Sequence, residues 1–156
     1  MTRTCATALL ALALLFLAAC GVQKASLSLG QIPAVVQHTF HQKFPSVANP
    51  DWSLKSDKNY EAEFTQNQVE MAVKIDPAGK WLETETTIPL SAVPQPVQNT
   101  AAIQFKDYKI IETQTLLRAG TEVLTYELHL DNGKQTVKAE FSAAGAILAQ
   151  SAKPKP

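Results

Sequence analysis

The sequence predicts an α+β fold of two tandem αββββ repeats, forming one antiparallel sheet of about eight strands with two helices packed on one face. Three observations support this prediction. The chain repeats itself once, each copy opens with a proline-led apolar stripe at helical spacing, and the rest of each copy alternates apolar with polar residues. Alternation with a period of two is typical of strands that have one buried and one solvated face.

The internal repeat divides the chain that follows the N-terminal leader. Ile32-Pro33 opens the first copy, and Val93-Pro94 opens the second 61 residues later. Farther along the offset grows to 66, as in Tyr60-Glu61 against Tyr126-Glu127 and Gly79 against Gly145. The extra residues predict a longer first hairpin in the second copy. A repeat of this length indicates a duplicated unit, with a first repeat over 32–90 and a second over 91–150.

The first repeat is expected to begin with a helix. The apolar stripe that runs from Ile32 through Val36 and Phe40 to Phe44 has helical spacing, and Pro45 ends it. Four strands follow, in which apolar residues alternate with polar ones. They are expected over 51–56, 60–65, 69–75 and 81–88, with turns at 57–59, 66–67 and 76–79.

The second repeat follows the same order. Pro94 suits a first helical turn, and Val97, Ala101 and Phe105 repeat the apolar stripe. The Asp131-Asn132-Gly133 stretch is a strong hairpin signal. Strands are expected over 109–117, 122–130 and 136–141, with a last strand after Gly145. Residues 151–156 are expected to form a loose, disordered tail.

The N-terminus predicts an exported lipoprotein. Residues 1–19 have the features of a signal peptide, since the apolar run at 8–19 is too short to span a bilayer. The run closes on Leu17-Ala18-Ala19-Cys20, which looks like a bacterial lipobox. We therefore expect lipidation at Cys20, with several acyl chains for stable anchoring. Residues 20–31 would then be the lipidated cysteine and a short tether.

The residues after Cys20 favour one location. An aspartate at the next position would suggest retention in the inner membrane of many Gram-negative bacteria, but this chain has Gly21 there. Residues 22–26 contain no acidic cluster of the kind that marks some surface-exposed lipoproteins. We expect a membrane-anchored periplasmic protein, with the outer membrane favoured if the cell has two membranes.

Composition and motifs narrow the function classes. The formal net charge is zero, so the chain has no basic excess for nucleic acid. Catalytic motifs such as a Gly-x-Ser-x-Gly elbow or a phosphate-binding glycine loop do not occur, and neither an enzyme nor a cofactor is expected. His38 and His41 are neighbours on the solvated side of the first helix, and we interpret them as solvated side chains rather than half of a metal site.

The solvated face of the sheet is the candidate protein-binding surface. By alternation it carries Glu61, Glu63, Glu70, Lys74, Glu127, His129, Lys138 and Glu140, with Glu83 and Glu85 added if the fourth strand keeps phase. His129 has no obvious partner in the sequence. The glutamate excess suggests a docking surface for a cationic protein or peptide segment. An ordinary solvated strand face, or cation binding by the same carboxylates, remains open as an interpretation.

Several short motifs, in this order, resemble a known family. They are an Ile32-Pro33 helix start, Lys43-Phe44-Pro45, Trp52, Tyr60-Glu61-Ala62-Glu63-Phe64, Asp76-Pro77-Ala78-Gly79-Lys80 and Leu82-Glu83-Thr84-Glu85. Together they resemble the PepSY-like, β-lactamase-inhibitor-like domains of bacterial secreted proteins and lipoproteins, over residues 31 to 150. The second copy matches less well, since it has no tryptophan at the position of Trp52.

The resemblance implies a tandem αββββ architecture and a binding role. Related domains restrain peptidases or bind proteins, and inhibitor-like members grip partners on a concave sheet. We expect a lipid-anchored module that binds an envelope protein or peptide through its exposed sheet face. The alternative is a small-ligand or cation-binding sensor or carrier.

Overall fold

The computed structural model describes residues 26–155, so Cys20, the predicted signal peptide 1–19 and the start of the tether lie outside the described residues. Eight strands pair in sequence order in one antiparallel sheet, and each run of four follows a helix. The first repeat contains η1 (Leu29–Gln31), α1 (Ala34–Lys43), β1 (Asp51–Leu54), β2 (Tyr60–Gln66), β3 (Val69–Ile75) and β4 (Trp81–Thr87). The second contains η2 (Leu90–Ala92), α2 (Gln95–Gln104), β5 (Lys109–Arg118), β6 (Leu124–Asp131), β7 (Gln135–Phe141) and β8 (Ile147–Pro154). Over residues 26–155, none of the helices is long and apolar enough to cross a membrane.

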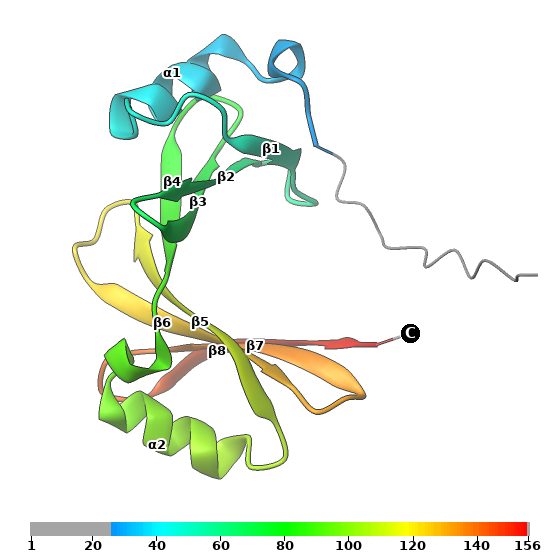
Figure 1. Ribbon diagram of the computed structural model, residues 1–156, viewed down its shortest axis with the longest axis vertical. Coiled ribbons are helices and arrows are strands. Elements are labelled where there is room, and N and C mark those ends of the chain that lie inside the picture. The colour runs from blue at the N-terminus through cyan, green and yellow to red at the C-terminus, as the bar shows by residue number, and fades with distance from the viewer. Residues whose placement is uncertain (1–25, 156) are drawn as a thin grey trace, which may run out of the picture.

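The strand register puts both helices on the same face of the sheet, as predicted. Residues that pair directly across antiparallel strands point to the same face, and residues two apart in one strand do so as well. The residues that share the helix-covered face include Ala62, Val73, Thr84 and Leu117 in β2 to β5, and Thr113, Leu128 and Ala139 in β5 to β7. Figure 1 shows α1 and α2 at opposite ends of the molecule, with the sheet bent between them. The helices therefore lie on the outside of the bend.

Each repeat has a hydrophobic cluster of its own. In the first repeat, Val36 and Phe40 of α1 pack on Trp52, Ala62 and Val73. In the second, the buried residues of α2 and the strands form a separate cluster. Its members are Val93, Val97, Ala101, Leu128, Leu130, Val137, Ala139 and Phe141. The pairing of β4 with β5 joins the two halves into one sheet.

The glycine shared by the two copies marks a close approach between a turn and a helix. Gly79 and Gly145 precede β4 and β8, and both have φ of +84°. A Cβ at Gly79 would lie 2.5 Å from Val35 Cγ2, and one at Gly145 would lie 2.6 Å from the carbonyl oxygen of Pro96. Both the backbone angle and the missing side chain are therefore required at these two positions.

The C-terminal end differs from the prediction of a loose tail over 151–156. Strand β8 extends to Pro154 and pairs with β7, with Thr136 opposite Lys153 and Gln135 opposite Pro154. The backbone N–H of Lys155 also donates to the carbonyl of Lys134 at 2.9 Å. All eight residues of β8 are exposed, because this edge strand is not covered on either side. Backbone pairing holds the segment in place, and such pairing leaves no apolar alternation in the sequence.

The longer first hairpin expected in the second repeat is present. β5 has ten residues where β1 has four.

Candidate functional site

The candidate site is the sheet face that carries no helix, here called the polar face. Strand register places eight of the nine glutamates of the chain on it. They are Glu61, Glu63, Glu70, Glu83, Glu85, Glu112, Glu127 and Glu140. The lysine and arginine residues that the strands place on this face are Lys74, Lys109, Arg118, Lys138 and Lys153. Asp51 and Asp131 lie on it too, and Lys55 reaches it from the turn after β1. The polar face therefore has an acidic excess although the whole chain is neutral.

The polar face contains a hollow of about 1060 Å³ that is open to solvent. Side chains from β1 to β7 line it, together with the loop at 46–49, so both repeats contribute. Because the helices lie on the outside of the bent sheet, the polar face lies on its inside (Figure 1). The bend converts a flat solvated surface into a concave one.

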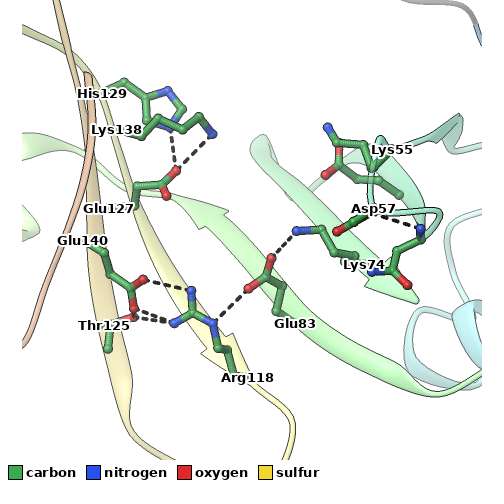
Figure 2. Close-up of polar contacts among 12 residues, drawn as sticks. Lys55, Asp57, Lys74, Glu83, Arg118, Thr125, Glu127, His129, Lys138 and Glu140 are labelled. Atoms are coloured by element: carbon green, nitrogen blue, oxygen red, sulfur yellow. Dashed lines mark hydrogen bonds and ion pairs between the residues drawn. The ribbon is translucent and has the colours of Figure 1, made fainter. Parts of the chain in front are cut away.

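A chain of ion pairs crosses the polar face from one repeat to the other (Figure 2). Lys74 Nζ lies 2.6 Å from Glu83 Oε1, and Arg118 Nε lies 3.1 Å from Glu83 Oε2. Arg118 also donates from Nη1 and Nη2 to the two carboxylate oxygens of Glu140, at 2.5 and 3.0 Å. We call Lys74, Glu83, Arg118 and Glu140 the charge ladder. It joins β3 and β4 of the first repeat to β5 and β7 of the second.

The pKa values in the ladder follow from these contacts. Burial alone would raise the pKa of Glu140, but hydrogen bonds from Arg118 and Thr125 outweigh it, so the pKa lies below its ordinary value. Burial would lower the pKa of Lys74, yet its hydrogen bond to Glu83 prevails and raises that pKa. Both shifts favour the charged forms. The ladder is therefore an internally neutralised structure at neutral pH.

His129, for which the sequence showed no obvious partner, lies between two carboxylates. Its Nδ1 is 2.6 Å from Glu112 Oε2, and its Nε2 is 2.7 Å from Glu127 Oε1. Lys138 Nζ approaches the same Glu127 oxygen at 3.1 Å. A neutral imidazole has one N–H, so both contacts are hydrogen bonds only when the ring is doubly protonated. Burial would raise the pKa of Glu127, but the bonds from His129 and Lys138 lower it overall.

The residues predicted for the binding face all lie on the polar face, but their availability differs. Glu61 is 5% exposed and pairs with Lys55 at 2.7 Å, so it is a buried structural carboxylate. Glu140 is held by the charge ladder. Glu63 and Lys74 are half-buried, and Glu70 is exposed. Whether these residues contact a partner stays a prediction.

Two residues outside the predicted set mark the floor of the hollow. Glu85 is half-buried on β4, and burial, followed by repulsion from Glu61, Glu127 and Glu83, raises its pKa although Lys138 opposes the shift. Gln114 on β5 is 9% exposed, and its Oε1 has no hydrogen-bond partner within residues 26–155. Glu85 was predicted on the solvated face on condition that the fourth strand keeps its alternation. No sequence signal marked Gln114.

The described part of the chain contains no group of three or more His, Cys, Asp or Glu side chains arranged to hold a metal ion. His38 and His41 are exposed on α1, as expected for solvated side chains.

Comparisons with known proteins agree with this architecture. The family model described as "Putative beta-lactamase-inhibitor-like, PepSY-like" matches in two overlapping segments, residues 20–76 and 58–149. No curated protein matches the sequence.

Solved structures share the fold at low sequence identity. A protein from Bacteroides eggerthii described as a putative periplasmic protein is 22% identical, with a TM-score of 0.66 over 77% of this chain and 88% of that one. A BLIP-like protein from Bacteroides fragilis is 19% identical, with a TM-score of 0.62 over 80% of this chain and 88% of that one. The two overlapping segments of the family match together cover most of the chain, and the chain belongs to the PepSY-like, β-lactamase-inhibitor-like family.

Proposed function

We propose that this protein is a lipid-anchored periplasmic module that binds a protein or peptide segment in the hollow of its polar face. The observation that carries the proposal is the hollow itself, an open concavity lined by β1 to β7 on the inside of the sheet. Small-molecule sites are usually enclosed and largely apolar, whereas this hollow is open and polar. Its shape suits a polypeptide segment better than a small ligand.

The proposed location combines the sequence with the family. The lipobox that ends at Cys20 supports acylation, and Gly21 supports transfer to an outer membrane where one exists. The similar structure from Bacteroides eggerthii is described as that of a putative periplasmic protein, which supports this location. Metabolic labelling with an alkyne fatty acid tests the anchor. Wild type should carry the label and fractionate with membranes, and Cys20→Ala should do neither.

Site-specific photo-crosslinking in cells tests the binding face. A photoreactive amino acid at Thr87, which lines the hollow, should yield a discrete crosslinked adduct. The same amino acid at His38, exposed on α1 on the other face, should not. Identical adducts from both positions would show that contact with other proteins is unspecific.

A steric block provides the second arm of this test. Ala72 lies on the polar face between Glu63 and Glu85 in the register, so Ala72→Trp would fill the hollow. The Thr87 adduct should disappear in this variant. It should persist in the matched control His41→Trp, which adds the same bulk to an exposed position of α1. Persistence of the adduct in both variants would contradict the proposed site.

A further inference from the structure

The carboxylates of the polar face are not equally available to a partner. Within the described residues, most already contact a lysine, arginine or histidine side chain. The pairs are Lys55 with Glu61, Lys74 and Arg118 with Glu83, Arg118 with Glu140, His129 with Glu112, and His129 and Lys138 with Glu127. An external cation would have to displace one of these partners, so these glutamates do not form the contact point.

Glu85 differs from the paired glutamates. Its neighbours in the register are Ala72 on β3 and Leu116 on β5, and neither side chain can donate a hydrogen bond. Among residues 26–155, its carboxylate makes no hydrogen bond or ion pair. Burial raises its pKa, so the ionised form is poorly compensated by the protein itself. A cation supplied from outside would provide the missing compensation.

Gln114 supplies an independent observation at the same place. It pairs with Thr87, two residues along β4 from Glu85, so it is a diagonal neighbour of Glu85 on the polar face, about 7–8 Å away. The side chain is 9% exposed and lines the same hollow. Its amide nitrogen donates to Glu112 Oε1 at 2.8 Å, which fixes the orientation of the amide and leaves Oε1 without a donor. A buried acceptor of this kind favours an incoming N–H group.

We propose that Glu85 and Gln114 form a subsite for one cationic side chain, lysine or arginine, of a bound polypeptide. This inference rests on the proposed function and names the chemistry of its partner. The carboxylate of Glu85 supplies the charge, and Oε1 of Gln114 supplies a second acceptor. The openness of the hollow and its lining from β1 to β7 argue for a polypeptide rather than a free amine. The surrounding acidic excess attracts the basic segment over a longer range.

Immobilised octapeptide libraries with randomised flanks test the subsite directly. One central position is fixed as lysine, arginine, norleucine or glutamate, and the full-length lipidated protein is applied in detergent micelles. Wild type should retain the lysine or arginine library at least about tenfold better than norleucine, the range expected for a charge-assisted hydrogen bond. Glu85→Gln should lose this preference. Glu122→Gln, at an exposed position in the turn between β5 and β6, should keep it.

Three results would overturn the inference. The first is equal retention of the lysine and norleucine libraries by wild type. The second is an unchanged preference in Glu85→Gln. The third is competition by methylammonium at the same concentration as a retained peptide, which would show that the subsite takes a free amine. Thermal unfolding of Glu85→Gln serves as the folding control, because removing a poorly compensated charge should not destabilise the protein.

The same variants separate this inference from the proposed function. If Ala72→Trp removes the Thr87 adduct and Glu85→Gln leaves it, the polar face binds a partner without the cation subsite. If neither substitution affects the adduct, both proposals fail.

Discussion

Replacing Arg118 with methionine tests whether the charge ladder holds the two repeats together. Arg118 lies at the end of β5 and binds Glu83 through Nε and Glu140 through Nη1 and Nη2. Methionine keeps an unbranched apolar stem but removes every donor. Glu83 would still have Lys74 at 2.6 Å, whereas Glu140 would keep only the Thr125 hydroxyl at 2.7 Å. The loss of stability therefore comes mainly from Glu140, whose carboxylate keeps a single hydrogen bond.

The expected magnitude follows from burial. The side chains of Glu83 and Glu140 are 12% exposed, and that of Arg118 is 41% exposed. Removing one partner of a buried pair costs about 3–5 kcal/mol, and an exposed pair contributes at most about 1 kcal/mol. Because the guanidinium is more than a third exposed, water screens part of the interaction. We expect a loss of about 2 kcal/mol in the free energy of unfolding, or a Tm lower by roughly 6–10 °C.

Urea unfolding at pH 7 measures this loss, followed both by tryptophan fluorescence and by far-UV circular dichroism. Trp52 and Trp81 both lie in the first repeat, so agreement of the two probes shows that the repeats unfold together. A double-mutant cycle with Glu140→Gln should give a coupling of about 1–2 kcal/mol. The matched control is Lys138→Met, which removes a 52% exposed charge and should change stability by about 0.5 kcal/mol or less.

The pH dependence fixes the sign of the effect. The folded-state pKa of Glu140 lies below its ordinary value, so its stabilisation is present above the unfolded-state pKa of about 4.3 and is lost as the pH falls through the folded value. The deficit of Arg118→Met should therefore be largest near neutral pH and shrink below about pH 4. A deficit no larger than that of Lys138→Met, or one that grows in acid, would refute this account of the ladder.

Further predictions concern Glu85, two glycines and the C-terminal strand. Glu85→Gln should stabilise the protein by about 1 kcal/mol at pH 7, because burial raises the pKa of Glu85. The gain should vanish below about pH 4, where folded and unfolded carboxyls are both protonated; equal effects at the two pH values in urea unfolding would contradict this. Gly79→Ala should cost more than about 2 kcal/mol against about 1 kcal/mol for Gly133→Ala. Both have φ of +84°, but only at Gly79 would the new Cβ meet Val35, and equal losses in calorimetry would exclude that contact. Deleting residues 151–156 should lower stability by about 1–2 kcal/mol and speed hydrogen exchange in β7, whereas unchanged protection there would show that the end of β8 adds nothing.

Much of the architecture was predictable because it follows from local periodicity. Apolar residues at helical spacing located α1 and α2, and period-two alternation located most strands and their buried faces. The end of β8 was missed because an uncovered edge strand has no apolar side to reveal it. Its position depends on backbone pairing with β7, which a local pattern does not encode.

The partners of His129 illustrate what local patterns leave out. β5 contains an irregularity between Ile110 and Glu112, and Ile111 between them is 58% exposed. This bulge brings Glu112 opposite His129 on the polar face. A bulge changes which side chains share a face, and alternation read from one strand cannot anticipate it.

The sequence by itself determined the duplicated αββββ order, the face on which most glutamates lie and the family, and it predicts lipidation at Cys20. Each of these depends on residue order or on a period of a few residues. Tertiary structure decided which carboxylates are neutralised and which are not. Arg118 can reach Glu140 only because β5, β6 and β7 are in register. Glu85 has no ion-pair partner among residues 26–155, because Ala72 and Leu116 flank it across the sheet. Charge pairing depends on distances between strands that are far apart in the chain, and these distances exist only once the sheet has formed and bent.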